Sequence, residues 1–354
     1  MSSTLANKNI LIEEFGRMRS GSEVKKYTLR NHKGLKISVI NYGGMITSLE
    51  VTDAAGTSRD VVLGYDTLEA YEDDTDYLGC LIGRYANRIR NAEFELNGQR
   101  YRLEPNEGNN HLHGGSEGFH KVFWNISPME ENGDPGLELT YQSKDGEQGY
   151  PGMLNVRVCY LLRDNALEIR YHATTTSTTI VNLTQHSYFN LNKDHSRDVL
   201  RHQLKVEAKS VLETDDASCP TGGVLDITDT SFDFTALREI GMPLQSNTTK
   251  SVHEYDHCYL LNTHGELQKA AQLSAPDSSI VMDVWTTEPA LQLYTGNYLN
   301  AVKGKNGTVY SRYCGVCLET QHYPDSPHHP DFPNTVLQPD EVYQSTTIYR
   351  FVQR

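Results

Sequence analysis

The sequence lacks long hydrophobic runs and an excess of basic charge, and both absences exclude classes of function. No stretch approaches the ~20 apolar residues that a membrane-spanning helix needs. The 46 acidic side chains outnumber the 32 basic ones, for a formal net charge of −14, and no Lys/Arg cluster reverses that sign locally. Such a charge opposes binding to nucleic acids and anionic membranes. Because residues 1–15 carry scattered charges and no apolar core, we expect no secretory signal and a soluble, cytoplasmic protein.

Cysteine is also scarce, with six residues in a chain of 354, which is not the disulfide framework of a small secreted protein. Cys314 and Cys317 form a CxxC, but on a strand residues three apart point to opposite faces, so their thiols could not easily share a metal. No second CxxC completes a zinc site. His111 and His113 have no carboxylate or third His at ligand spacing nearby. We therefore predict neither a metal nor a cofactor.

Several common motifs and patterns are missing as well. The phosphate-binding pattern GxxxxGK[ST] and the nucleophile elbow GxSxG do not occur. Helical periodicity is rare, and residues 68–71 and 236–240 are the best helix candidates. No repeat of 20–50 residues and no low-complexity linker divides the chain. We therefore expect one domain over residues 1–354.

Strand and turn signals, by contrast, recur along almost the whole chain. Residues 94–103 read as a hairpin, because Asn97-Gly98 suits a type I′ turn between two short strands. Further strand-like runs cover residues 137–142, 156–162, 166–171 and 280–285. Many short strands with few helices indicate an all-β sandwich or barrel. We predict a large antiparallel β-sandwich, with the concave face of a sheet as the natural ligand site.

A polar side chain interrupts one of these apolar runs near the C-terminus. Residues 315–323 read as a strand that is followed by a Pro-rich loop, and Glu319 lies toward the end of that strand. A carboxylate at the mouth of a packed strand is well placed for proton transfer. The alternative interpretation is a strand-end Glu that only faces solvent.

Polar residues also gather inside five other strand-like segments: residues 83–89, 109–115, 182–191, 255–260 and 291–297. Each gathering has a structural interpretation beside the functional one. His186 could be a hydrogen-bonded core histidine, Arg88 a strand-end cation, Asp256 a turn cap and Gln292 a partner of backbone groups. From the residues alone, the prediction stops at a soluble all-β protein with a polar groove.

The order and number of these motifs resemble those of the aldose 1-epimerases, also called galactose mutarotases. The resemblance runs from residues 41–44 and 60–65, through 118–124 and 145–152, to the end of the chain. It implies a single β-supersandwich domain that acts on small aldose sugars without a cofactor. The implied reaction interconverts the α and β anomers of free hexoses, and the protein would be a monomer or a homodimer.

The resemblance also implies roles for individual residues. Glu319 corresponds to the general base of the family and His186 to its general acid, while His113 corresponds to a second active-site histidine. The positions that hold sugar hydroxyls correspond to Asn87, Arg88, Asp256 and Gln292. Two neighbours depart from the family pattern, since Gln185 and His328 stand where Asn is expected. Because both lie beside the catalytic positions, they bear on substrate preference more than on chemistry.

The implied chemistry sets requirements for the acid and the base. We expect nearby donors to keep Glu319 ionised and a nearby negative charge to keep His186 protonated. Three alternatives stay open at this point. The first is a hexose-6-phosphate 1-epimerase, which would need a further cationic group near C6 of the sugar. The others are a non-catalytic sugar-binding protein and a glycoside hydrolase, for which Asp256 is the one candidate for a second acid.

Overall fold

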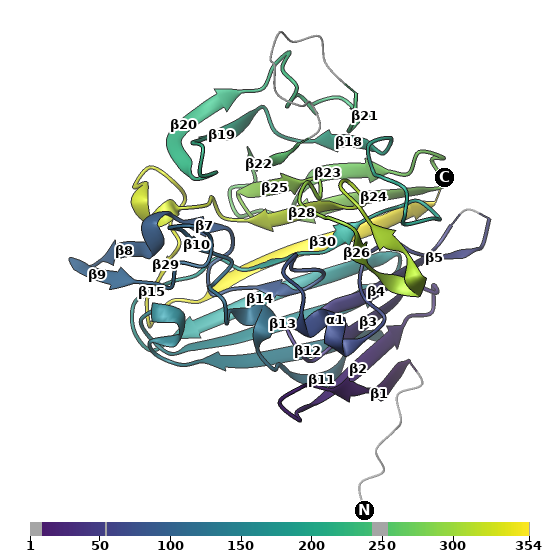
Figure 1. Ribbon diagram of the computed structural model, residues 1–354, viewed down its shortest axis with the longest axis horizontal. Coiled ribbons are helices and arrows are strands. Elements are labelled where there is room, and N and C mark those ends of the chain that lie inside the picture. Colours follow the sequence, from purple (N-terminus) through teal and green to yellow (C-terminus); the bar gives the residue numbers. More distant parts are fainter. Residues whose placement is uncertain (1–8, 54, 243–253, 354) are drawn as a thin grey trace, which may run out of the picture.

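A nine-stranded antiparallel sheet crosses the molecule in the computed structural model, which describes residues 9–53, 55–242 and 254–353 (Figure 1). Residues 1–8, part of the segment for which we expected no secretory signal, lie outside the described residues. In spatial order the sheet consists of β11 (Asn125–Glu131), β12 (Asp134–Ser143), β13 (Leu154–Arg163), β14 (Ala166–Thr175), β30 (Tyr343–Gln353), β24 (Ile280–Thr286), β23 (Gln268–Ser274), β18 (Gln203–Val206) and β21 (Arg238–Glu239).

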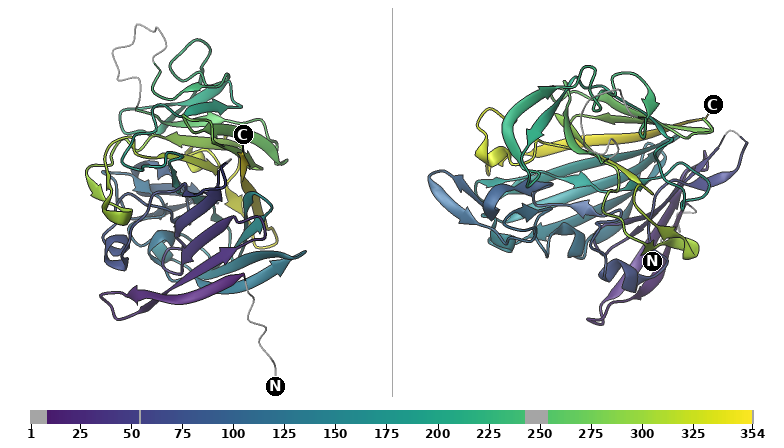
Figure 2. Two further views of the ribbon diagram at one scale, coloured as in Figure 1. Left: turned by 90° about the vertical axis from the view of Figure 1, so that its right-hand side faces the viewer. Right: turned by 45° about the horizontal axis from the view of Figure 1, so that its top comes forward.

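Two smaller antiparallel sheets pack against this sheet (Figure 2). The first is a five-stranded meander of β1 (Ile10–Arg17), β2 (Glu23–Arg30), β3 (Lys36–Ile40), β4 (Ile46–Thr52) and β5 (Ser58–Asp60). The second has six strands in the order β17 (Tyr188–Phe189), β28 (Val316–Gln321), β25 (Ala290–Tyr294), β22 (Asp256–Leu260), β19 (Ser210–Thr214) and β20 (Pro220–Asp226). The predicted all-β, large antiparallel architecture is therefore confirmed.

Short two-stranded sheets and helical turns connect these layers. The strand pairs are β6 (Leu81–Ile82) with β16 (Thr184–Gln185), β7 (Arg88–Ile89) with β10 (His111–Leu112), β8 (Glu93–Leu96) with β9 (Gln99–Arg102), β15 (Thr179–Ile180) with β29 (Val336–Leu337), and β26 (Val302–Lys303) with β27 (Val309–Tyr310). The helical turns are α1 (Leu68–Glu72), η1 (Arg90–Ala92), η2 (Phe119–Lys121), η3 (Glu147–Gly149), η4 (Lys305–Gly307) and η5 (Ser326–His328). None of the described helices is long and apolar enough to cross a membrane.

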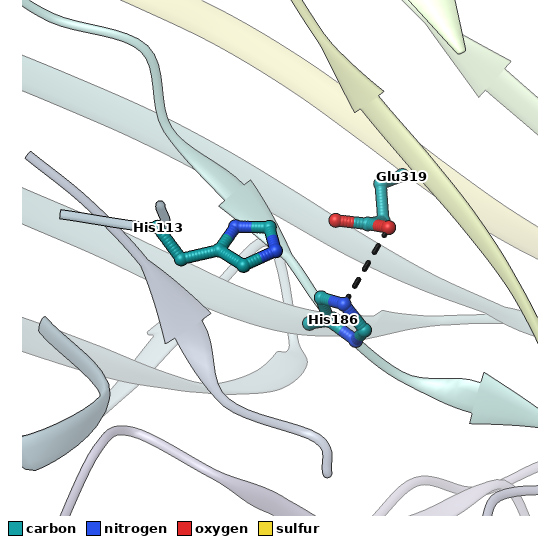
Figure 3. A group of neighbouring side chains, drawn as sticks. All are labelled: His113, His186 and Glu319. Atoms are coloured by element: carbon teal, nitrogen blue, oxygen red, sulfur yellow. Dashed lines mark ion pairs between the residues drawn. The ribbon is translucent and has the colours of Figure 1, made fainter. Parts of the chain in front are cut away.

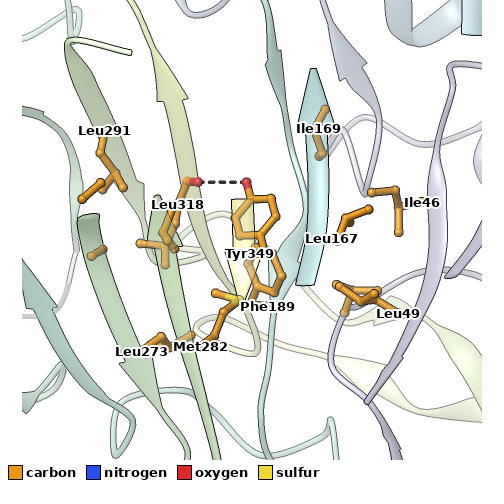
Figure 4. Close-up of a cluster of buried hydrophobic side chains, with 14 of the residues drawn as sticks. Ile46, Leu49, Leu167, Ile169, Phe189, Leu273, Met282, Leu291, Leu318 and Tyr349 are labelled. Carbon is orange, nitrogen blue, oxygen red and sulfur yellow. Dashed lines mark hydrogen bonds between the residues drawn. The ribbon is translucent and has the colours of Figure 1, made fainter. Parts of the chain in front are cut away.

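One hydrophobic core fills the space between the three larger sheets (Figure 4). Leu167 from β14 and Ile46 from β4 meet there with Leu318 from β28, and all three side chains are almost completely buried. Tyr349 from β30 lies between them, and its hydroxyl donates to the carbonyl oxygen of Leu318 at 3.3 Å. Burial of this much apolar surface fixes the register of β28, because a slip of one residue would turn Leu318 away from the core.

The two faces of β28 therefore have different surroundings. Leu318 and Thr320 face the nine-stranded sheet, where the hydroxyls of Thr320 and Thr347 are 2.5 Å apart. Cys317 and Glu319 alternate with them and project from the opposite face. The packing of the apolar face thus holds Glu319 in a constant position on the other side of the sheet.

Most local predictions agree with the structure, and one is wrong. The turn of the β8–β9 hairpin has positive φ at both Asn97 (53°) and Gly98 (74°), as a type I′ turn requires. The helix expected at residues 68–71 is α1, which is capped by the Thr67 hydroxyl. Residues 236–240, however, do not form a helix, because Arg238–Glu239 pair with β18 as an edge strand. A five-residue segment is too short to hold a helix against such pairing.

Candidate active site

The six-stranded sheet supplies three candidate side chains from adjacent strands. The pairing of β25 with β28 sets Gln292 directly opposite Glu319. The pairing of β22 with β25 sets Asp256 opposite Tyr294, two residues along β25 from Gln292. Since directly opposite residues of antiparallel strands share a face, these side chains lie together. The amide of Gln292 donates to the Asp256 carboxylate at 2.6 Å.

His186 reaches the same point from the loop between β16 and β17. Its Nε2 lies 3.6 Å from Oε1 of Glu319 (Figure 3), and its Nδ1 lies 3.6 Å from the sulfur of Cys317. Its backbone N–H donates to the carbonyl oxygen of Cys80 at 2.9 Å. The side chain of the neighbouring Gln185 bonds to backbone groups. Its amide nitrogen donates to the carbonyl oxygen of Gly79, and its side-chain oxygen accepts from the backbone N–H of Ser187.

His113 brings a second imidazole to the site from the turn after β10. It has a φ of 52° and precedes two glycines that also have positive φ. The Nδ1 atom of His113 accepts a hydrogen bond from the backbone N–H of Asn87 at 3.2 Å. A neutral imidazole that accepts at Nδ1 carries its proton on Nε2, so His113 offers a donor. The His113 and His186 ring centroids are 5.3 Å apart.

Arg88 closes another side of the site and is held by a partner that the sequence did not reveal. Its guanidinium donates to both carboxylate oxygens of Glu107, at 2.8 and 2.5 Å. Its remaining nitrogen, Nη1, lies 3.8 Å from the Asp256 carboxylate. The side-chain oxygen of Asn87 accepts from the Arg88 backbone N–H at 2.9 Å, which shapes the turn that aims the arginine. All seven candidate residues thus lie in one connected group.

Tyr77 is a further site residue without a sequence signal. Its backbone has a φ of 60°, which is unusual for an aromatic residue. Its ring centroid lies 4.7 Å from that of His113, 4.8 Å from that of His120 and 6.0 Å from that of His186. Only the tertiary fold places this ring against three histidines, so neither spacing nor composition could have revealed it.

The protonation of the central pair differs from our expectation. Burial, reinforced by the negative charge of Asp256, raises the pKa of Glu319 well above its ordinary value. Burial lowers the pKa of His186 to about 4. The expectation that nearby donors keep Glu319 ionised is wrong, because its Oε2 has no hydrogen-bond partner among the described residues and Arg88 is engaged by Glu107.

One group among the described residues has the spacing of metal ligands. The ligating atoms of His113, His186 and Glu319 all lie within 4.8 Å of one another. Two imidazoles and a carboxylate are a donor set that zinc accepts. The two thiols of the CxxC are free and are not part of this group.

Comparisons with known proteins agree on one family. The aldose 1-epimerase family profile matches residues 25–350. Galactose mutarotase of Bos taurus is 40% identical over 314 residues, which cover 88% of this chain and 90% of that protein. Aldose 1-epimerase of Escherichia coli strain K12 is 37% identical over 310 residues, covering 87% and 88%.

Solved structures give the same result at the level of the fold. An aldose epimerase homologue from C. elegans superimposes with a TM-score of 0.85 at 28% identity, covering 92% of this chain and 98% of that one. Galactose 1-epimerase from Lactobacillus acidophilus NCFM gives a TM-score of 0.84 at 28% identity, covering 97% and 98%. The chain therefore belongs to the aldose 1-epimerase family, whose members are isomerases that interconvert sugar anomers.

Proposed function

We propose that this chain, folded as one domain over residues 1–354, is an aldose 1-epimerase of free hexoses such as glucose and galactose. Glu319 acts as the base and His186 as the acid. One observation carries the proposal: a buried carboxylate and a buried imidazole face each other at 3.6 Å. Groups that suit neutral hydroxyls surround them, above all Asp256 and Gln292.

The reaction needs two proton transfers in each direction. Glu319 takes the proton of the C1 hydroxyl while His186 gives a proton to the ring oxygen. The bond between C1 and the ring oxygen then breaks and leaves an open-chain aldehyde. After rotation about the C1–C2 bond, the reverse transfers close the ring on the other face of C1. Both side chains return to their starting states within one turnover, as general acid–base catalysis requires.

The pKa directions are compatible with these roles because the pair holds one proton in total. A neutral Glu319 beside a neutral His186 has the same proton count as a carboxylate beside an imidazolium. Hydroxyl groups of a sugar that donate to Glu319 favour the second arrangement. The charge of Asp256 acts on both partners, since it stabilises an imidazolium at His186 and opposes a carboxylate at Glu319. The apparent pKa values of activity therefore belong to the pair rather than to either residue.

The remaining groups orient the sugar. His113 can donate from Nε2 to a sugar oxygen, because its Nδ1 is occupied by the Asn87 N–H. Arg88 is held rigidly by Glu107, so that its orientation does not have to be fixed at each binding event. Asp256 accepts hydrogen bonds from hydroxyls, and Gln292 holds its carboxylate in place.

Polarimetry of freshly dissolved α-glucose and α-galactose tests the proposal. Each of the substitutions Glu319→Gln and His186→Asn should lower kcat by roughly 10²–10⁴, the usual contribution of a positioned acid or base. Circular dichroism should show an unchanged fold. Rates close to wild type in either variant would remove that residue from its role. If the protein binds sugar without accelerating mutarotation, it is a sugar-binding protein instead.

The alternative of a phosphorylated substrate is disfavoured by charge. The cavity that adjoins Asp256 is lined by carboxylates, including Asp215, Asp226 and Glu254, which would repel a phosphate group. Activity on glucose should therefore exceed activity on glucose 6-phosphate at low ionic strength. The reverse order would favour the hexose-6-phosphate 1-epimerase.

A further inference from the structure

Cys317 lies beside the ring nitrogen of His186 that does not face Glu319. Its sulfur is 3.6 Å from Nδ1 of the imidazole, and the other nitrogen, Nε2, is 3.6 Å from Oε1 of Glu319 (Figure 3). Cys317 and Glu319 are two positions apart on β28, so they project from the same face of the sheet. One strand thus supplies a neighbour for each of the two ring nitrogens.

The sheet fixes the position of Cys317. The residue pairs with Tyr188 of β17 on one side and with Tyr294 of β25 on the other, and it is completely buried. The rings of both tyrosines also lie against His186, with centroids 5.1 and 6.4 Å from the imidazole centroid. The sulfur and the imidazole are therefore held by the same two neighbours.

Cys317 is a neutral thiol. Burial raises the pKa of its sulfur well above the ordinary value, and the charges of Glu319 and Asp256 act in the same direction. A neutral thiol is a weak donor and a weak acceptor of hydrogen bonds. It can therefore bind a ring nitrogen of His186 without placing a charge beside the imidazole.

Proton exchange at Nε2 requires one particular tautomer of His186. The shared proton moves between the Glu319 carboxyl group and Nε2, so Nε2 needs a free lone pair while Glu319 is protonated. A neutral imidazole with a free Nε2 carries its proton on Nδ1, and the sulfur of Cys317 is the side-chain acceptor at that nitrogen. His113 has the opposite tautomer, because its Nδ1 accepts from the Asn87 N–H.

We propose that Cys317 is a positioning residue for the general acid, whose sulfur accepts a hydrogen bond from Nδ1–H of His186 and keeps Nε2 available for proton exchange. The inference rests on the proposed function, in which Nε2 exchanges its proton with Glu319 and with the ring oxygen of the sugar. The group that orients a histidine in this way is often a carboxylate or a backbone carbonyl. A neutral sulfur fixes the same orientation without stabilising the imidazolium by charge, so the imidazolium gives up its proton more readily.

Two-dimensional nitrogen–proton NMR of the histidine rings tests this inference directly. The signals of His186 are assigned by their loss in His186→Asn. In the wild type at neutral pH we expect Nδ1 of His186 to carry the proton and Nε2 to be free. Cys317→Ala should mix the two tautomers. In Cys317→Ser, which keeps a donor and an acceptor, Nδ1 should remain the protonated nitrogen.

Polarimetry on glucose measures the consequence for the reaction. Cys317→Ala should lower kcat about threefold to tenfold, the effect of one lost hydrogen bond, and leave KM within about twofold because the groups that bind the sugar remain. Cys317→Ser should recover part of that loss. Cys314→Ala is the matched control, since Cys314 is also buried but its sulfur contacts Ser311 and Ser196. It should leave both kcat and the tautomer of His186 unchanged.

Failure of this inference is distinguishable from failure of the proposed function. If the wild type does not accelerate the mutarotation of glucose, the proposed function fails, and the reason for a free Nε2 fails with it. If the wild type is active but Nδ1 of His186 carries no proton, only the role of Cys317 is overturned. The wild-type spectrum decides this even if Cys317→Ala does not fold.

Two other results would also overturn the role of Cys317. The ring of His186 has a hydrogen bond to its own backbone, which raises its pKa. An unchanged tautomer in Cys317→Ala would therefore assign Nδ1–H to that backbone group. Equal losses of kcat in Cys317→Ala and Cys314→Ala would show that buried thiols act here through packing alone.

Discussion

Two Glu–His pairs with buried glutamates lie near each other along β28, and their hydrogen bonding differs. Glu319 on β28 faces His186 at 3.6 Å, and its Oε2 has no hydrogen-bond partner among the described residues. His322 directly follows β28, and its Nδ1 donates to the carboxylate of Glu288 at 2.6 Å. The other oxygen of Glu288 accepts from the Tyr343 hydroxyl at 3.0 Å. Both glutamates are at most 2% exposed, so burial alone does not distinguish them.

The hydrogen bonds decide the charge state of each pair. Burial raises the pKa of Glu288, but His322 and the hydroxyls of Tyr343 and Ser345 outweigh it, and the net shift is downward. Burial likewise lowers the pKa of His322, but Glu288 reverses the shift. In the Glu319 pair burial prevails, so that the pKa of Glu319 is raised and that of His186 falls to about 4.

The comparison separates a pair whose hydrogen bonds are satisfied from a pair that retains free hydrogen-bonding capacity. Glu288 and His322 form a satisfied ion pair, and the Asn182 side chain binds the backbone of His322 on both sides. This arrangement fixes the end of the strand that carries Glu319. Glu319 itself keeps free hydrogen-bonding capacity, which a substrate can use. Perturbed, unsatisfied titratable groups of this kind are characteristic of functional sites.

The largest expected difference between the two pairs is in kcat, and it is tested by removing the carboxylate from each pair in turn. Glu319→Gln should lower kcat for glucose by roughly 10²–10⁴, because it removes the base. Glu288→Gln, the matched control, should keep kcat within a few-fold when assayed well below its unfolding temperature. Polarimetry of both purified variants measures the difference. Similar losses in the two would mean that Glu288 also acts in the reaction.

On stability, by contrast, Glu288→Gln should have a larger effect than Glu319→Gln. Glu288→Gln leaves His322 without its counter-charge. Breaking a fully buried pair costs about 3–5 kcal/mol, and we expect a smaller loss here because the His322 side chain is 22% exposed. Urea denaturation should show this loss most fully between the ordinary pKa values of Glu and His, 4.5 and 6.5. It should shrink as the pH falls through the lowered pKa of Glu288 or rises through the raised pKa of His322. A pH-independent loss would contradict the charged pair.

Of the two pairs, a substitution of Asp256 should change the pKa values of only the Glu319–His186 pair, because the charge of Asp256 raises the pKa of both Glu319 and His186. Asp256→Asn should raise KM for glucose about tenfold, with a smaller effect on kcat, since a binding contact is lost. It should also move both limbs of the pH profile of kcat/KM to lower pH. In the wild type, the acid limb should report the gain of a second proton by the pair. Unmoved limbs would remove Asp256 from the electrostatics of the pair.

The smallest expected effect is a gain in folding stability from Glu319→Gln. Because folding raises the pKa of Glu319, the folded state keeps a proton that the unfolded state loses above pH 4.5. Stability therefore falls as the pH rises through this range. Glu319→Gln removes that cost and should stabilise the protein by about 1 kcal/mol at pH 8 and by nothing measurable at pH 4. Thermal unfolding at the two pH values measures it, and a loss at pH 8 would contradict the raised pKa.

Local features of the fold could be predicted from the sequence where short-range physics decides them. The Asn97-Gly98 turn needs two residues that tolerate positive φ, and the neighbouring runs alternate, so the hairpin follows from adjacent residues alone. The strand-like runs at residues 156–162 and 166–171 likewise lie within β13 and β14, which pair with each other. Residues 236–240 could not be assigned correctly, because pairing with β18 forms their strand and β18 lies more than thirty positions earlier in the chain.

In the candidate site, too, the sequence predicted some features and only the folded structure revealed others. The sequence shows acids, imidazoles and amides within strand-like segments, and the family pattern connects Glu319 with His186. It does not show Glu107 as the partner that holds Arg88, nor Tyr77 against three histidines. These contacts join segments that are adjacent only after folding, and none of them leaves a periodicity or spacing in the chain.

The sequence by itself therefore determined the fold class, the local turns and the chemical types of the groups on β28. Only the tertiary structure decided which glutamate is charged. Glu288 and Glu319 are the same residue type with similar burial, and their pKa values move in opposite directions. The physical reason is that the free energy of a buried carboxylate depends on the donors that surround it, and those donors come from distant parts of the chain.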